Sequence, residues 1–210
     1  MALYIGNQKV APTMLPSGSV SIPLEVSSNG RLQKPTSSFS WSLPSYVTSI
    51  TAYTLYYAFY NTGITSVDLS SLITVSGQSA MQYAFSGCDD LTNVDLSNLT
   101  TIGQGSMGEA FSYCKSLTSI SFPSLINMAQ SALGAVFRGC TSLTTLAFPS
   151  LNSNSFGQYT SQFDNMLLGV TGCAVHFPSN LQSVIGSWSS VTSGFGGTNT
   201  TVLFDLPATE

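Results

Sequence analysis

Residues 84–99 read AFSGCDDLTNVDLSNL, and the same pattern returns as AFSYCKSLTSISFPSL at 110–125 and as VFRGCTSLTTLAFPSL at 136–151. The unit is F-x-x-C-x-x-L-x-x-Φ-x-Φ, where Φ is an apolar residue, and it is followed by a second apolar pair such as Leu99 with Ile102. Its phenylalanines stand 26 residues apart, at Phe59, Phe85, Phe111, Phe137 and Phe163. A fixed period of this length predicts a solenoid, because no single copy can bury its apolar face alone.

The end of each copy has the alternation of a strand. In LTNVDL, Val94 and Leu96 point to one side, while Asn93 and Asp95 point to the other. Stacked copies then form a parallel sheet with strands about 4.8 Å apart. The connectors, such as SGQSAMQYAF and GQGSMGEAF, predict a loop that enters one or two turns of α-helix or 3-10 helix.

The first and last copies depart from the consensus. The copy at 58–72 lacks one residue and the cysteine, and an insertion in the last copy moves the equivalent of Leu146 to Val175. Irregular terminal copies are typical of a stack whose ends face water. We therefore predict an α/β or mainly β solenoid of about five stacked 26-residue copies, with short helical or 3-10 turns and a small β-rich N-terminal segment.

Composition excludes several classes of partner. Only 7% of the 210 residues are charged, and five scattered basic residues in a chain of net charge −4 form no stripe for phosphates, which argues against nucleic acid. The sequence contains no run of about 18 apolar residues, so we expect no membrane insertion. The opening MALYIGNQKVAP lacks the features of a secretory signal, so we expect either an internal protein or export by another route, such as assembly into a particle.

The cysteines are expected to pack. Cys88, Cys114 and Cys140 share one interior position, which favours a ladder of reduced thiols over catalysis. Four cysteines without a CxxC pair, and one histidine, predict neither a disulfide framework nor a zinc site. Asp89 and Asp90 become other residues in the next copies, which indicates a solvated turn.

The outward residues of successive strands predict a polar sheet face. Asp68 and Asp95 should lie side by side, where two carboxylates either bind Ca²⁺, share a proton or are simply hydrated. His176 should lie three strands beyond Asp95, about 15 Å away, which excludes a His-Asp dyad between them. We therefore expect that the protein is not an enzyme, has no catalytic residue and binds no metal or cofactor.

Tyrosines cluster in YTLYYAFY at 53–60. They either anchor a ligand or cover the first turn of the stack. The ligand-binding residues predicted from the sequence combine this cluster with the sheet face: Ser66, Asp68, Asn93, Asp95, Ser119, Ser121, Thr145, His176, Tyr56 and Tyr60.

Residues 50–186 resemble the BspA-like leucine-rich repeats, whose consensus runs approximately A-F-x-x-C-x-x-L-T-S-I-x-[IL]-P. AFSGCDDLTNVDL, AFSYCKSLTSISFP and VFRGCTSLTTLAFP match it closely, and AFYNTGITSVDL matches its cysteine-less variant. The resemblance implies a leucine-rich-repeat solenoid, display on a cell surface and adhesion to host or neighbouring-cell macromolecules. The opening LYIGNQKVAP is similar to the start of some phage or prophage structural proteins of gut bacteria.

These features predict three segments: an N-terminal β-rich cap or attachment segment at 1–48, the repeat solenoid at 49–186, and a closing strand with a tail at 187–210. The predicted function is non-enzymatic recognition or adhesion, with a surface protein or glycan of a host or neighbouring cell as partner. The alternative is a structural or decoration component of a phage-like particle. The expected location is accordingly extracellular, on a cell surface or on such a particle.

Overall fold

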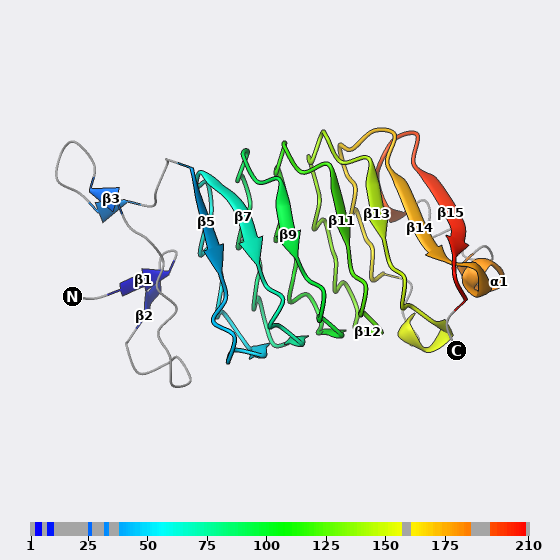
Figure 1. Ribbon diagram of the computed structural model, residues 1–210, viewed down its shortest axis with the longest axis horizontal. Helices are drawn as coiled ribbons and strands as arrows, with labels where there is room; N and C mark the ends of the chain where they lie inside the picture. The colour runs from blue at the N-terminus through cyan, green and yellow to red at the C-terminus, as the bar shows by residue number, and fades with distance from the viewer. Residues whose placement is uncertain are drawn as a thin grey trace.

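The computed structural model describes residues 3–5, 8–10, 25–26, 32–33, 38–156, 161–185 and 194–208. From residue 38 onward, the described chain coils into a parallel-sheet solenoid of about six turns, which runs across Figure 1 from β5 to β15. The predicted solenoid is therefore confirmed.

One side of the coil is a sheet of parallel strands. They are β5 (Phe39–Ser42), β7 (Ile64–Asp68), β9 (Asn93–Asp95), β11 (Ser119–Ser121), β13 (Thr145–Ala147), β14 (Ala174–Pro178) and β15 (Thr201–Leu206). Hydrogen-bonded pairing joins β5-β7-β9 and, separately, β11-β13-β14-β15. The register follows the repeat, since Val67 pairs with Val94. The predicted shift in the last copy is also present, because Leu146 pairs with Val175.

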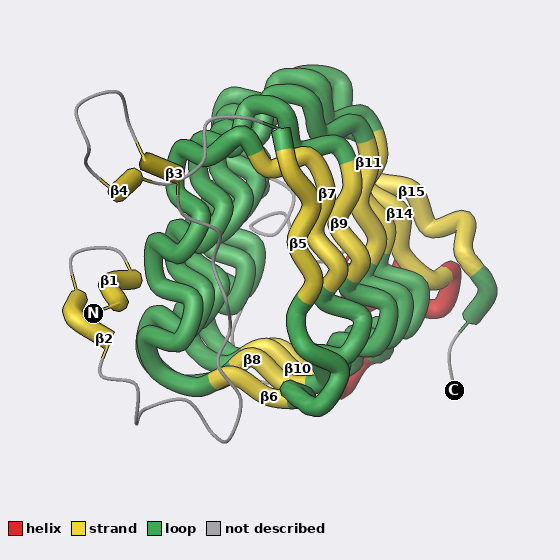
Figure 2. The backbone as a smooth tube through the Cα atoms, turned by 60° about the vertical axis from the view of Figure 1, so that its left-hand side comes forward, coloured by secondary structure: helices red, strands yellow, loops and turns green. Residues whose placement is uncertain are grey.

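A second side carries short parallel strands, which Figure 2 shows at the bottom of the coil. They are β6 (Ser49–Ile50), β8 (Thr74–Val75), β10 (Thr101–Ile102) and β12 (Asn127–Met128). Their second residues form the other apolar row of the repeat, and Ile50, Val75, Ile102 and Met128 are all buried.

The third side consists of turns, where one or two turns of α-helix or 3-10 helix were expected. We call it the turn face; it comprises residues 52–61, 78–87, 104–113, 130–139 and 162–169. The Ala58 N–H donates to the Leu55 carbonyl at 3.0 Å, and Tyr57 between them has a φ of 53°. This is the pattern of a type II turn, whose third residue has a positive φ. Alternate N–H groups donate to the following coil instead, as from Leu55 to Ala80 and from Phe59 to Ala84.

Ladders of identical side chains fill the interior. The rings of Phe59, Phe85 and Phe111 stack at centroid distances of 5.1 and 5.3 Å with nearly parallel planes. A second ladder joins Phe122 to Phe148 at 5.3 Å and continues from Phe148 to Phe177 at 5.4 Å. Each copy thus buries its phenylalanines against its neighbours, as the period predicts.

The cysteines are buried and free, as predicted for a packing ladder. The thiols of Cys88, Cys114 and Cys140 donate to the carbonyls of Phe59, Phe85 and Phe111 at 3.0, 3.2 and 3.0 Å. Each bond crosses to the preceding coil, so the thiols also satisfy buried backbone acceptors.

Strands β5 and β15 are the outermost described strands of the parallel stack. β5 pairs with β7, and β15 pairs with β14. Two antiparallel pairs precede the stack: β1 (Leu3–Ile5) with β2 (Gln8–Val10), and β3 (Glu25–Val26) with β4 (Leu32–Gln33). The other residues of 1–37 lie outside the described residues, and β5 falls within the predicted N-terminal segment 1–48. The division into three segments stays a prediction.

Helix is scarce among the described residues. Its elements with described bounds are η1 (Ser153–Phe156), η2 (Ser179–Leu181) and α1 (Gln182–Ile185). Within this part of the chain, no helix has the length and apolar character needed to cross a membrane.

Candidate functional site

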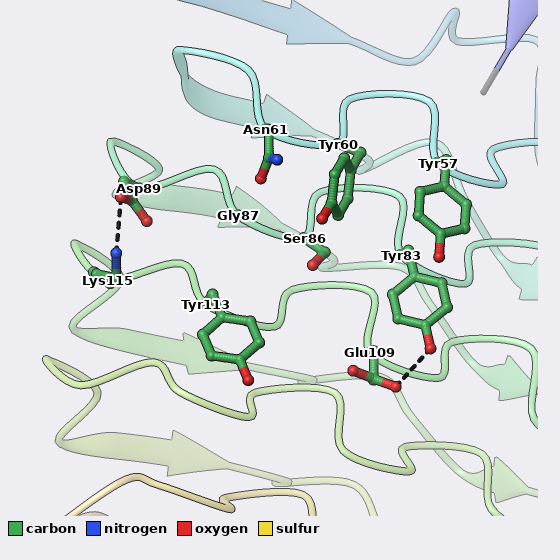
Figure 3. Close-up of a pocket in the computed structure, with 10 residues that line it drawn as sticks. All are labelled: Tyr57, Tyr60, Asn61, Tyr83, Ser86, Gly87, Asp89, Glu109, Tyr113 and Lys115. Carbon is green, nitrogen blue, oxygen red and sulfur yellow. Dashed lines mark hydrogen bonds and ion pairs between the residues drawn. The ribbon is translucent and has the colours of Figure 1, made fainter. Parts of the chain in front are cut away.

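One concavity on the turn face has four tyrosines among its ten lining residues. Its volume is about 360 Å³, and side chains of three consecutive copies surround it (Figure 3). We call it the tyrosine pocket. Its lining residues are Tyr57, Tyr60, Asn61, Tyr83, Ser86, Gly87, Asp89, Glu109, Tyr113 and Lys115.

Three of these tyrosines have left-handed backbone conformations. The φ angles of Tyr57, Tyr83 and Tyr113 are 53°, 56° and 59°. A bulky residue in this region costs on the order of 1–3 kcal/mol, so its presence needs a reason. Tyr113 is the clearest case, because the other copies place Asn61, Gly87, Gly139 and Asn165 two residues after their phenylalanine. Asparagine and glycine tolerate this conformation, whereas tyrosine does not favour it.

The ring of Tyr113 is held by the next coil. A Cβ on Gly139 would lie 2.5 Å from the ring carbon Cδ1, so the absence of a side chain there makes room for the ring. The Arg138 guanidinium carbon lies 5.9 Å from the ring centroid, within the range of a cation–π contact. Although positioned in this way, Tyr113 keeps 41% of its surface exposed.

Tyr83 and Glu109 form the polar side of the pocket. The Tyr83 hydroxyl donates to Glu109 Oε1 at 2.7 Å, and its ring stacks on that of Tyr57 at 4.7 Å. The hydrogen bond to the carboxylate, together with burial, raises the pKa of Tyr83 to about 12. The pKa of Tyr57 is raised as well, chiefly by burial. Figure 3 shows the Glu109 carboxylate between Tyr83 and Tyr113, with its other oxygen turned toward Tyr113.

The remaining charges of the pocket neutralise each other. Lys115 Nζ lies 3.0 Å from Asp89 Oδ2, and each side chain is about half exposed, at 56% and 54%. An ion pair this exposed adds little to stability. Since Lys115 and Asp89 are matched, Glu109 gives the lining residues a net charge of −1, and the Arg138 cation lies beside them over Tyr113.

The sheet-face residues predicted as ligands occur in the expected register. Ser66 pairs with Asn93 and Asp68 with Asp95. Ser119 pairs with Thr145, and Ser121 with Ala147, which in turn pairs with His176. Tyr56 and Tyr60 instead belong to the turn face, so the structure places the ten predicted residues on two different sides of the coil (Figure 2). Of these ten, only Tyr60 lines the tyrosine pocket.

The two aligned carboxylates already have local partners. Asp68 Oδ1 accepts the Ser70 N–H, and Asp95 Oδ1 accepts the Ser97 N–H, each at 2.9 Å. The bonds to Ser70 lower the pKa of Asp68. Aspartate commonly closes turns in this way. These contacts give both acids a structural role at the ends of their strands.

Another, smaller concavity interrupts the sheet. It has a volume of about 220 Å³ and lies where β9 meets β11, between which no strand pairing occurs in the described chain. Val94 is only half-buried there, whereas its equivalents Val67, Ile120 and Leu146 are buried. Asn93, Asp95 and Ser121 are among its lining residues.

His176 has an acidic partner other than Asp95, which the sequence-based prediction did not include. Its Nδ1 lies 2.9 Å from Oδ1 of Asp205 on β15. The prediction considered only the acids of the preceding copies, and the register of the closing strand was unknown. Among the described residues, no cluster of three or more histidine, cysteine, aspartate or glutamate side chains is arranged to hold a metal ion.

Sequence reasoning missed Tyr83, Glu109 and Tyr113. A signal for Tyr113 was present, since it replaces glycine or asparagine at one position of the repeat. Glu109 gave a weaker signal, as a lone charge within an otherwise uncharged connector.

Comparison with known families agrees with the fold. Residues 34–133 match the family described as BspA type leucine rich repeat region (6 copies). No curated protein and no solved structure matches the chain. Repeats of this type suggest a protein-interaction or adhesion module, and their family is typically a non-enzymatic scaffold. The matched segment begins just before β5 and ends beyond β12, so this chain carries a BspA-type leucine-rich repeat region that forms part of a longer parallel solenoid.

Proposed function

We propose that this protein is a non-enzymatic recognition module that binds a surface protein or glycan of a host or neighbouring cell through its turn face. One observation carries the proposal. The tyrosine pocket combines exposed aromatic rings with polar groups from consecutive copies, on a backbone that holds bulky residues at an unfavourable φ. The same positive φ recurs outside the pocket, at Ser79, Ser131 and Ala135, so the particular feature of the pocket is that tyrosines occupy these positions.

Tyrosine suits a recognition surface for physical reasons. It offers a large contact area and loses little side-chain entropy on binding, because only two torsions need to be fixed. In the pocket, the side-chain freedom of two tyrosines is already restricted before any ligand binds, because Tyr83 is hydrogen-bonded to Glu109 and Tyr113 lies against Gly139. Preorganised rings lower the cost of association.

The sheet face supports the proposal less strongly. Its central acids close turns, and its outward row contains small residues such as Ser121 and Ala147. Asn93, Ser119 and Thr145 stay candidates as a second contact area. The proposed location is a bacterial cell surface, where BspA-like repeats are typically found.

The alternative, a component of a phage-like particle, depends on the resemblance of residues 3–12. Only strands β1 and β2 of that stretch are described, and the comparisons do not bear on it. A gene neighbourhood of tail or capsid genes would favour this alternative.

The test is an array of extracellular-matrix proteins, cell-surface proteins and glycans probed with the folded chain. We expect saturable binding to at least one protein or glycan. A folded chain that binds nothing on a broad array would contradict the proposal.

A further inference from the structure

We propose that the tyrosine pocket binds an arginine side chain of a protein partner. The inference rests on the proposed recognition function and deepens it by naming the chemical group recognised. It depends on three features of the pocket: its aromatic rings, the orientation of Glu109, and the charge of the surrounding solenoid.

The aromatic rings offer faces and edges to a planar cation. Tyr60 and Tyr113 lie on opposite sides of the cavity from each other, with Tyr83 along its wall (Figure 3). A guanidinium is attracted to the face of a tyrosine within about 6 Å of its centroid. The chain already shows this contact once, because the Arg138 guanidinium carbon lies 5.9 Å from the centroid of Tyr113. An incoming guanidinium would therefore use the other face or the edge of that ring, together with Tyr60 and Tyr83.

Glu109 supplies the matching anion. One carboxylate oxygen accepts the Tyr83 hydroxyl at 2.7 Å, which fixes the group, and the other is turned toward Tyr113 across the cavity. A carboxylate held beside aromatic rings binds a guanidinium through a charge-assisted hydrogen bond while the rings contact its plane. Lysine has the charge but lacks the flat, weakly hydrated surface that stacks on a ring.

The surrounding charge favours a cation over an anion. Residues 38–208 carry seven acidic and two basic side chains, a net charge of −5 with histidine neutral. Of the two basic groups, Lys115 is paired with Asp89, whereas Arg138 keeps its charge over Tyr113 and offsets part of this negative field. Acidic groups on a partner segment would be repelled by this surface, whereas a segment that carries arginine would be attracted to it.

The experiment is an NMR titration of the chain, labelled with ¹³C in its tyrosine rings, with a short glycine-spaced arginine peptide. Two matched peptides replace arginine with lysine or with citrulline, its uncharged isostere. We expect saturable shifts at Tyr60, Tyr83 and Tyr113 with a Kd of about 1 mM for the arginine peptide. The citrulline peptide should bind at least about tenfold more weakly, because it loses the cation–π and charge-assisted contacts.

Variants assign the effect to the pocket. Glu109→Gln keeps the shape and removes the charge, and should weaken arginine binding severalfold. Tyr113→Gly should abolish it, while Tyr113→Phe, which keeps the ring, should restore most of it. Asp164→Asn removes an exposed carboxylate on the same face outside the pocket and should bind like the unmodified chain.

Three outcomes would overturn the inference: equal binding of the arginine and citrulline peptides, unchanged binding by Glu109→Gln, or no saturable shift up to roughly 10 mM peptide. If simple sugars shift the same tyrosines while the arginine peptide does not, the pocket is a glycan site. In that case the recognition function stands and only its ligand class changes. Absence of any binder on the array contradicts the function itself.

Discussion

The ring of Tyr113 lies against the backbone of Gly139 one coil further along, so that a Cβ on Gly139 would stand 2.5 Å from Cδ1 of the ring. Two positions that are equivalent in the repeat thus form one contact, with the large residue in one copy and the smallest in the next. Tyr113 has the strained backbone, and Gly139, at a φ of 69°, has the conformation that glycine favours.

This contact predicts coupling between the two positions. Gly139→Ala should destabilise the chain by more than about 2 kcal/mol, because alanine is unfavourable at that φ and its methyl group collides with the ring. In a Tyr113→Gly background the collision is gone, and only the backbone cost of about 1–2 kcal/mol should remain. Chemical denaturation of the four variants of the cycle measures the difference. Strictly additive effects would mean that the ring does not rest on Gly139.

The phenylalanine ladder predicts a large core effect in a central copy. Phe111 is fully buried between Phe85 and Phe137, at centroid distances of 5.3 and 6.1 Å. Replacing Phe111 with alanine should cost about 3–5 kcal/mol in the free energy of unfolding. Tyr46→Ala, at a side chain that is 57% exposed, is the matched control and should cost little. A loss below about 1 kcal/mol for Phe111→Ala would refute the stacking register.

The cysteine ladder predicts unreactive thiols. All four cysteines are buried, and the hydrogen bond with Cys140, followed by burial, raises the pKa of Cys114 well above its usual range. Because the thiolate is the reactive form, a disulfide reagent at neutral pH should modify none of the four in the native chain. All four should react after denaturation. Rapid labelling of any thiol before unfolding would contradict the buried ladder.

The raised pKa of Cys173 predicts a loss of stability at alkaline pH. Burial raises its pKa from 9.0 to about 11, so the fold favours the protonated thiol. The resulting stabilisation is complete below the unfolded pKa, and it is lost as the pH rises through the folded one. The free energy of unfolding should therefore fall between pH 9 and 11, by on the order of 2 kcal/mol from this group. Cys173→Ala should show a shallower fall, and an identical slope in both proteins would argue against the shift.

The hydrogen bond between Tyr83 and Glu109 predicts that Glu109 influences the pKa of the Tyr83 hydroxyl. The hydrogen bond to the carboxylate and burial raise the pKa of Tyr83 to about 12, so the phenol should stay protonated after pH 10 is passed. Glu109→Gln should lower this pKa toward 10.0, as measured by ¹³C NMR of tyrosine rings with Tyr83→Phe for assignment. Asp164→Asn should leave it unchanged. An unchanged pKa of Tyr83 in Glu109→Gln would contradict the hydrogen bond that orients the carboxylate.

The sequence was sufficient to predict the stacking. A period of 26 fixed which side chains meet between coils, including the ladder of Cys88 and Cys114 and the displaced equivalence of Leu146 with Val175. Each of these follows from one rule, that identical positions lie above one another in a solenoid.

The turn face could not be predicted in the same way. Bonds from residue i+3 to residue i occur in both 3-10 helices and type II turns, and the apolar spacing of a connector does not distinguish them. The left-handed φ of Tyr57 or Tyr113 is imposed by bonding to neighbouring coils, against the preference of tyrosine itself. The pocket combines positions offset along three copies, so no single copy contains its pattern. The contact of His176 with Asp205 depends on the register of β15, and the repeat could not predict that register because β15 lies outside it.

The most direct test of recognition by the turn face compares two double variants on the same binding array. One removes pocket rings through Tyr60→Ser and Tyr113→Gly, and the other changes the exposed sheet-face residues Asn93 and Ser119 to alanine. Both should remain folded, since none of these side chains is buried. Loss of at least about tenfold in affinity for the turn-face variant, which corresponds to roughly 1.4 kcal/mol, with little change for the sheet-face variant, is the expected result. Full binding by the turn-face variant would contradict it.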